Sequence, residues 1–168
     1  PDTPAEAMEN AEAARAGDIV VLTVPADHQI STLELVKDSL AGKILIDVTV
    51  PLVPPKVGTV QMPPEGSAGK RAQDFLGEEV RVVSAFQNIA AHLLQQDVAI
   101  ECDVLVTGND KESRQRVIDM IGEAGMTGWH AGPIANAAAA ESLTSILIQI
   151  NRSGGISHSG IKIIGQEH

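Results

Sequence analysis

Two apolar stretches of similar wording decide the fold: residues 18–25 read DIVVLTVP and residues 44–51 read ILIDVTVP. Each is a continuous run of strand length that ends at a proline, and such runs are typical of parallel strands covered on both faces. Between them, leucines and a valine recur at helical spacing over residues 31–40. The order predicts strand, helix and strand, which is the βαβ unit of a parallel α/β sheet.

The rest of the chain continues this alternation. A helix over residues 5–16 precedes the first strand, and a loop over 51–66, with five prolines and two glycines, follows the second. A segment with so many prolines and glycines does not form a helix or a strand. Long ordered loops often have a function of their own. Beyond it we expect, in order, a helix at 68–76, a strand at 81–86, a helical segment at 89–96, a strand at 104–109, a helix at 111–124 capped by Asp110, and a last helix at 135–151.

This order predicts a Rossmann-like, doubly wound, mainly parallel sheet of about four strands between residues 18 and 109, with helices on both faces. A complete dinucleotide-binding domain begins with a strand and a G-x-G-x-x-G turn that holds the pyrophosphate. The 168 residues contain no such turn after a strand, and they open at Pro1 rather than at a methionine. We therefore expect residues 1–168 to form a single domain that is the C-terminal part of an NADP-binding Rossmann-like domain plus a C-terminal helical region, lacking the first βαβ portion.

The amino-acid composition limits the classes of partner that the protein can bind. Twelve Lys and Arg against 22 Asp and Glu give a net charge of -10, which argues against binding to nucleic acid or to an anionic membrane. The single cysteine, Cys102, cannot form an internal disulfide, and no apolar run reaches the roughly 20 residues that span a bilayer. The spacings HxxxH, HExxH and CxxC are all missing, so we expect no metal site. A cytoplasmic location follows as the default.

Four segments carry a specific resemblance. DIVVLTVPADHQ, VVSAFQNIAA, VLVTGNDKESRQRVIDMI and AGPIANAAAAESLTSILIQIN, the last followed by SGIKI, resemble the NADPH-dependent F-420 reductase family, also called F-420:NADP oxidoreductase. The resemblance runs from about Ala11 to Ile164 and is most specific from Ala131 to Asn151. More distantly, the chain is similar to the reductase domain of STEAP-type metalloreductases, whose strand-end motif has the form A-F-N.

The resemblance implies hydride transfer between NADPH and the deazaflavin coenzyme F-420, with NADP(H) and F-420 as cofactors. In this family the deazaflavin stacks over the nicotinamide at the C-terminal side of the sheet. Gln87 departs from the pattern, since the family often has His there. Glu141, Ser142 and Thr144 match the family's E-S-L-T and have no independent role that the sequence reveals.

Ligands of open α/β sheets bind outside the carboxyl ends of the strands, and hydride transfer needs two flat rings held in a dry slot rather than a nucleophile. We therefore expect no catalytic acid or base and a cofactor-binding site at three strand ends. Its members are Thr23, Val24 and Pro25; Thr49, Val50 and Pro51; and Phe86, Gln87, Asn88 and Ile89. A structural alternative stands beside this reading: Val24 and Pro25 would merely end a strand, and the Gln87 and Asn88 amides would cap the next helix.

Two other functions stay open from the sequence. The chain could be a non-catalytic fragment or remnant that acts in dimerisation or regulation, or a related NADPH-dependent flavin or ferric reductase. We also expect a homo-oligomer, because Leu143, Ile146, Leu147 and Ile150 form an apolar stripe on the last helix.

Overall fold

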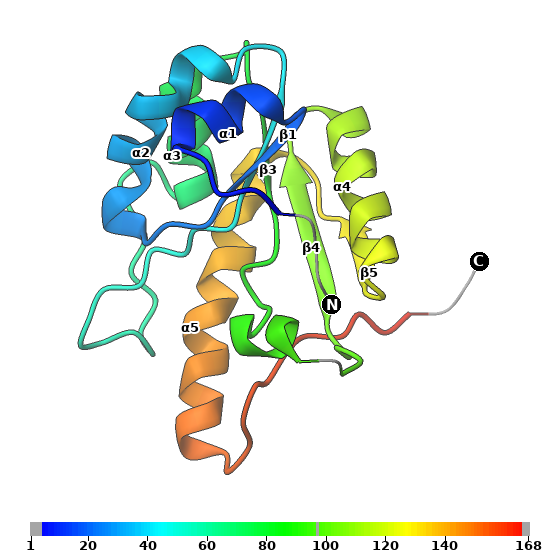
Figure 1. Cartoon of the computed structure of the whole chain (residues 1–168). Coiled ribbons are helices and arrows are strands. Elements are labelled where there is room, and N and C mark those ends of the chain that lie inside the picture. The colour runs from blue at the N-terminus through cyan, green and yellow to red at the C-terminus, as the bar shows by residue number, and fades with distance from the viewer. Residues whose placement is uncertain (1–4, 97, 166–168) are drawn as a thin grey trace.

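The computed structural model describes residues 5–96 and 98–165. Five strands form one sheet in the order β1-β2-β3-β4-β5 (Figure 1). They are β1 at Ile19–Leu22, β2 at Ile44–Asp47, β3 at Arg81–Ser84, β4 at Asp103–Gly108 and β5 at Thr127–His130. The α-helices are α1 at Asn10–Ala16, α2 at Gln29–Val36, α3 at Ala68–Leu76, α4 at Lys111–Glu123 and α5 at Ala137–Ser153.

The parallel βαβ prediction for the first half is confirmed. β1 pairs with β2 and β2 with β3, both in parallel, with Val21 opposite Ile46 and Ile46 opposite Val83. Residues 44–47 of β2 are buried throughout, as a strand covered on both faces requires.

The orientation of β4 differs from expectation. It runs antiparallel to β3, whereas β5 lies parallel to β4. A parallel return needs a crossover of a dozen or more residues that usually contains an α-helix. Among its described residues, the connection from β3 to β4 contains one short 3₁₀ helix, Ala91–Gln95, where we expected a longer helical segment at 89–96. Without a helix packed along the sheet, the chain re-enters it in the opposite direction.

The ends of several helices differ by a few residues from the predicted ones. α1 starts at Asn10 rather than at residue 5. α2 starts at Gln29 and gives way to a 3₁₀ turn at Lys37–Ser39, and a 3₁₀ turn at Ile134–Asn136 leads into α5. The predicted cap of α4 is confirmed, because the Asp110 carboxylate accepts a 2.7 Å hydrogen bond from the Ser113 backbone N–H.

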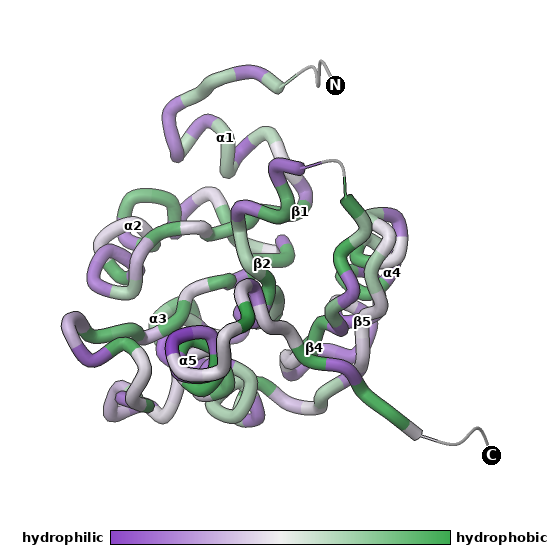
Figure 2. Tube along the Cα trace, turned by 90° about the horizontal axis from the view of Figure 1, so that it is seen from below, coloured by the Kyte–Doolittle hydropathy of each residue, from purple (hydrophilic) through white to green (hydrophobic). Residues whose placement is uncertain are grey.

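Helices cover the two faces of the sheet unequally (Figure 2). α1, α2 and α3 pack on one face, where Leu22, Leu45 and Val82 belong to the same buried cluster as Leu33 of α2. The other face carries α4, whose Val117 and Ile121 pack over a second cluster of strand residues. Since successive strand residues point to opposite faces, the apolar residues of β1, β2 and β3 alternate between these two clusters. Val21, on the α4 side of the edge strand β1, is 47% exposed.

The last helix and the C-terminal segment complete the molecule. α5 extends past the sheet, and the segment after it turns back beside β4 (Figure 1). There the Asp103 N–H donates to the Ile161 carbonyl at 2.9 Å, and the Ile163 N–H donates to the Asp103 carboxylate at 2.8 Å. In the part of the chain that the structure describes, no helix combines the length and apolar character needed to cross a bilayer.

Candidate functional site

A hollow of about 490 Å³ lies on the α4 face of the sheet, at the carboxyl ends of β1 and β2 and beside the segment that follows β3. It has the size of a typical small-molecule site. Half of the ten predicted site residues line it. They are Thr23, Val50, Phe86, Gln87 and Ile89.

The walls of the hollow are almost wholly apolar. Strand side chains form its floor, Ala91 and Leu94 of the 3₁₀ helix stand at one side, and Met120 of α4 contributes from another. Thr23 and Gln87 are the polar side chains among the eleven described residues that line it, and none of the eleven is ionisable. Such a wall favours a flat, uncharged ring over a phosphate or a metal ion.

Gln87 is the better held of the two polar groups. Its side-chain N–H₂ donates to the Asp47 carbonyl at 3.0 Å and to the Ser84 hydroxyl at 2.8 Å, and the residue is only 6% exposed. These bonds link the end of β3 to the end of β2. Gln87 is therefore a fixed part of the wall rather than a free surface amide.

The backbone just before Gln87 is strained. Phe86 has φ 71°, in the left-handed region that bulky residues rarely adopt. Strain of this kind costs of order 1–3 kcal/mol, persists only where the surroundings enforce it, and clusters at functional sites. The turn at 86–89 is therefore held in place by contacts with other elements.

The remaining predicted residues point elsewhere. Val24 packs against the core under α1, α2 and α3, and Pro25 precedes the 3₁₀ turn that leads into α2. Thr49 is buried, and its hydroxyl has no hydrogen-bond partner among the described residues. Pro51 lines a separate pocket of about 320 Å³. Asn88 turns toward α5, so the ten strand-end residues do not form one surface.

Sequence reasoning missed a buried polar network on the opposite face of the sheet. The Gln29 side chain donates to the Asp47 carboxylate and, at 2.9 Å, to the Ala68 carbonyl. Its oxygen accepts a 2.7 Å bond from Arg71 Nε. The Glu141 carboxylate accepts bonds from the backbone N–H groups of Ala68 at 2.7 Å and Gly69 at 2.9 Å. The network joins β2, α2, α3 and α5.

The network holds two buried carboxyl groups with perturbed acidity. Burial, with a smaller contribution from the negative charge of Asp47, raises the pKa of Glu141 to about 7, against the lowering by the two backbone N–H groups and the Arg71 charge. Burial also raises the pKa of Asp47 above its ordinary value, opposed by the hydrogen bonds from the Thr49 backbone N–H and the Gln29 side chain and by the Arg71 charge. Neither carboxyl group lines the hollow, so their role there is indirect.

The histidines and the cysteine stand outside the hollow. His28 is exposed in the turn before α2, and the ring of His92 packs against that of His158, with centroids 3.7 Å apart and ring planes tilted by 56°. The described residues contain no group of three or more His, Cys, Asp or Glu that could hold a metal ion. Burial raises the pKa of the Cys102 thiol, and the Asp103 charge adds to that rise, so the reactive thiolate is disfavoured.

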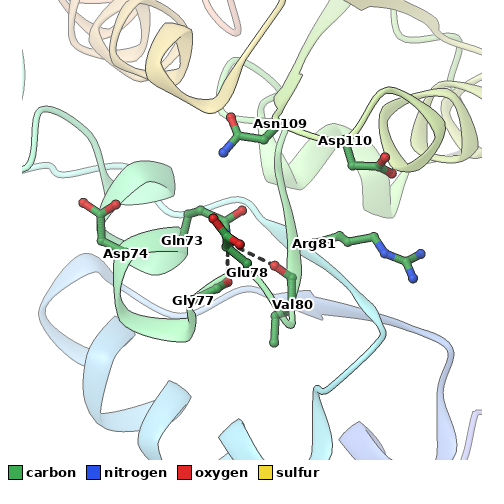
Figure 3. Close-up of a pocket in the computed structure, with 8 residues that line it drawn as sticks. All are labelled: Gln73, Asp74, Gly77, Glu78, Val80, Arg81, Asn109 and Asp110. Atoms are coloured by element: carbon green, nitrogen blue, oxygen red, sulfur yellow. Dashed lines mark hydrogen bonds between the residues drawn. The ribbon is translucent and has the colours of Figure 1, made fainter.

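A second large pocket, of about 460 Å³, lies at the opposite edge of the sheet (Figure 3). Arg81, the first residue of β3, lines it together with Asn109 and Asp110 at the end of the antiparallel β4. Gln73 spans its base through bonds to the Gly77 and Val80 carbonyls at 2.7 and 3.0 Å. This pocket is lined by both acidic and basic side chains and touches none of the predicted site residues.

Comparison with known proteins identifies close relatives. The family model described as NADP oxidoreductase coenzyme F420-dependent matches residues 3–51. The F420-dependent NADP reductase of Methanocaldococcus jannaschii is 35% identical over 165 residues, which cover 95% of this chain and 74% of that protein. The enzyme of the same name from Methanothermobacter thermautotrophicus is 34% identical over 168 residues, covering 96% and 72%.

The fold agrees with these relatives. The chain superposes with a TM-score of 0.81 and 25% identity on a crystal structure from an Arthrobacter species described as a candidate F420-dependent NADP reductase. The match covers 94% of this chain and 74% of that one. The Rossmann-like fold class predicted from the sequence is thereby confirmed.

Proposed function

Because the chain belongs to the family of F420-dependent NADP reductases, we propose that the protein transfers a hydride between NADPH and coenzyme F-420. The observation that supports this most directly is the hollow of about 490 Å³ with no ionisable residue among the described residues that line it. Hydride transfer requires two stacked rings, excluded water and a few polar anchors, and no protein acid or base.

The lining residues fit a flat heteroaromatic ring. Val50 and Ile89 supply apolar contact from two strand ends, and Phe86 adds an aromatic face. Thr23 and the Gln87 amide supply the polar anchors that fix the orientation of a ring carboxamide or carbonyl. When bound, NADPH supplies the hydride and F-420 accepts it. The protein aligns the rings and keeps water away.

The test uses the full-length product of the gene and follows the deazaflavin absorbance band after NADPH is added to F-420. Val50→Trp fills the hollow with a bulky side chain and is expected to lower turnover at least about tenfold, which is about 1.4 kcal/mol of barrier. Leu35→Trp is the matched control, because Leu35 is 71% exposed on α2. Equal turnover of both variants would refute the placement of the rings.

The same assay addresses the choice of acceptor. Reduction of F-420 but not of free flavin or ferric chelate by NADPH supports the proposal. Turnover with flavin or iron and none with F-420 would favour the related reductase class instead. Absence of all three activities would leave a non-catalytic role.

We further propose that the protein forms a homodimer through α5. Ile146 and Ile150 are 47% and 39% exposed, and Ile156 just beyond the helix is 52% exposed. Leu147 of the predicted stripe is already buried within the chain, so the available surface is smaller than the sequence indicated. Light scattering should give a dimer for the unmodified protein and a monomer for Ile146→Glu.

A cytoplasmic location stays a prediction from the sequence.

A further inference from the structure

We infer that Thr144 is a positioning residue that holds the 86–89 turn against the hollow from behind. The inference rests on the proposed hydride transfer for its effect on rate. Its structural part concerns only contacts within this chain.

The Thr144 hydroxyl bonds to the turn in both directions. It donates to the Gln87 carbonyl at 2.8 Å and accepts from the Asn88 side-chain N–H₂ at 3.2 Å. A hydroxyl has one donor and two acceptor sites, so it can make both bonds at once. The same Asn88 N–H₂ also donates to the Ala140 carbonyl at 3.0 Å. One side chain of α5 thus engages two consecutive residues of the turn.

These contacts lie where the backbone needs them. Phe86, at φ 71°, directly precedes the two residues that Thr144 holds. Within the turn itself, the Ile89 N–H closes a bond of 3.2 Å to the Phe86 carbonyl. A short turn with one strained residue and one internal bond depends on outside support to keep a single conformation.

α5 is in turn anchored by Glu141, three residues earlier and on the same face of the helix. The Glu141 carboxylate is 1% exposed and is bonded to the first two residues of α3, Ala68 and Gly69. The helix that carries Thr144 is therefore fixed relative to the sheet. Glu141 thus bonds α5 to α3, and Thr144 bonds α5 to the 86–89 turn, which gives the E and the T of the E-x-x-T pattern a structural role.

Thr144 does not line the hollow in which we propose that the rings bind. Phe86, Gln87 and Ile89 line the hollow, and Thr144 and Asn88 do not; these two line a small pocket of about 130 Å³ on the α5 side of the turn, which Gln87 and Ile89 also border. Thr144 therefore acts on the rings only through the backbone of the turn. A displacement of about 1 Å between reacting groups can cost about a hundredfold in rate.

The test compares Thr144→Val, which replaces the hydroxyl with a methyl group, with Thr144→Ser, which keeps the hydroxyl. In the full-length gene product, Thr144→Val is expected to lower kcat by about 10- to 100-fold, and Thr144→Ser to restore most of it. The primary deuterium isotope effect with NADPH labelled at the transferred position should rise in the valine variant, since misaligned rings slow the chemical step. Ser153→Ala is the control, because the Ser153 hydroxyl on α5 donates to the Gln149 carbonyl one turn earlier and not to the 86–89 turn.

A second readout needs no activity. Hydrogen exchange of the Ile89 amide in the cofactor-free protein should be at least about tenfold faster in Thr144→Val than in Thr144→Ser, since the bond it makes closes the turn. If wild-type protein shows no NADPH-to-F-420 turnover, the proposed function fails, and the exchange comparison still decides whether Thr144 holds the turn. Equal exchange in the two variants would overturn the inference. So would a fall in kcat with an unchanged isotope effect, or equal loss of kcat in both variants.

Discussion

Replacement of Glu141 by Gln should change how the stability of the protein depends on pH. Glu141 is buried between α5 and the first turn of α3, and its carboxylate accepts the Ala68 and Gly69 N–H groups. Burial raises its pKa from the ordinary 4.5 to about 7, so in the folded protein the group binds a proton over a pH range where the unfolded chain has lost it.

The sign and size follow from proton linkage. Because the folded pKa exceeds the unfolded one, the contribution of Glu141 to stability is fully present below about pH 4.5 and is lost as pH rises to about 7. Each pH unit between the two pKa values corresponds to about 1.36 kcal/mol, which gives a loss of about 3 kcal/mol across this window. Gln cannot ionise and therefore has no such loss. Its amide still offers one oxygen to the α3 N–H groups, and the loss of the second bond that the ionised carboxylate makes costs about 1–2 kcal/mol.

Urea unfolding followed by circular dichroism at several pH values between 4.5 and 7.5 measures this difference. The stability of wild type minus that of Glu141→Gln should fall by about 3 kcal/mol from the acidic to the neutral end. Asp47, whose pKa burial also raises, contributes to the slope of both proteins. Glu34→Gln, an exposed change on α2, is the control and should parallel wild type. Parallel curves for wild type and Glu141→Gln would show that the buried carboxyl keeps an ordinary pKa and would refute the reasoning.

Three further predictions concern the cofactors and the histidines. Asn88→Ala, which frees one side of the 86–89 turn, and Ile89→Trp, which fills the hollow, should each lower NADPH-to-F-420 turnover by about 10- to 100-fold. His28→Ala and His92→Ala should stay within about fivefold, since the reaction needs no general acid; loss of turnover in a folded His28→Ala protein would identify an acid–base enzyme. The 168-residue chain alone has no G-x-G-x-x-G turn and should bind NADPH no tighter than about 1 mM in isothermal titration, whereas micromolar binding would place a pyrophosphate site in residues assigned here to the scaffold.

The first three strands were predictable because each carries its own signal. Their apolar runs are long enough to be read without knowledge of neighbours, and their order follows from the crossovers between them. β5 had no such signal: Thr127–His130 reads TGWH, with neither alternation nor an apolar run. Its place is set by contact instead, since Trp129 Nε1 donates to the Asp103 carboxylate at 2.8 Å and a side chain at Gly128 would meet Ile118 and Ile121 of α4.

For the candidate site, too, one part was predictable from the sequence and another was not. Strand-end position predicted Thr23, Val50, Phe86, Gln87 and Ile89, because a residue just after a parallel strand must lie at the ligand edge of the sheet. Position along the strand could not say which face a side chain takes after the strand has ended.

The buried polar network on the opposite face of the sheet could not be predicted, for a different reason. Glu141 and Gln29 are polar residues in helices, where a single sequence gives no reason to expect burial. Their partners lie 72 and 18 residues away, in Gly69 and Asp47. Only the packing of α5 and α2 against α3 brings such groups together, so no local pattern could have shown them.

The reversal of β4 limits which elements can contribute to the site. Had β4 run parallel to β3, its carboxyl end and the N-terminus of α4 would lie beside Phe86 and Gln87 and would add Asn109 and Asp110 to the hollow. Because it runs antiparallel, these polar groups lie at the opposite edge, in the pocket of Figure 3. The hollow is left with an apolar wall from α4 and the 3₁₀ helix, and its strained turn depends on α5 for support. The reversal of β4 therefore leaves the hollow without an ionisable side chain among the described residues that line it, and the support for its turn comes from α5, through the Thr144 hydroxyl.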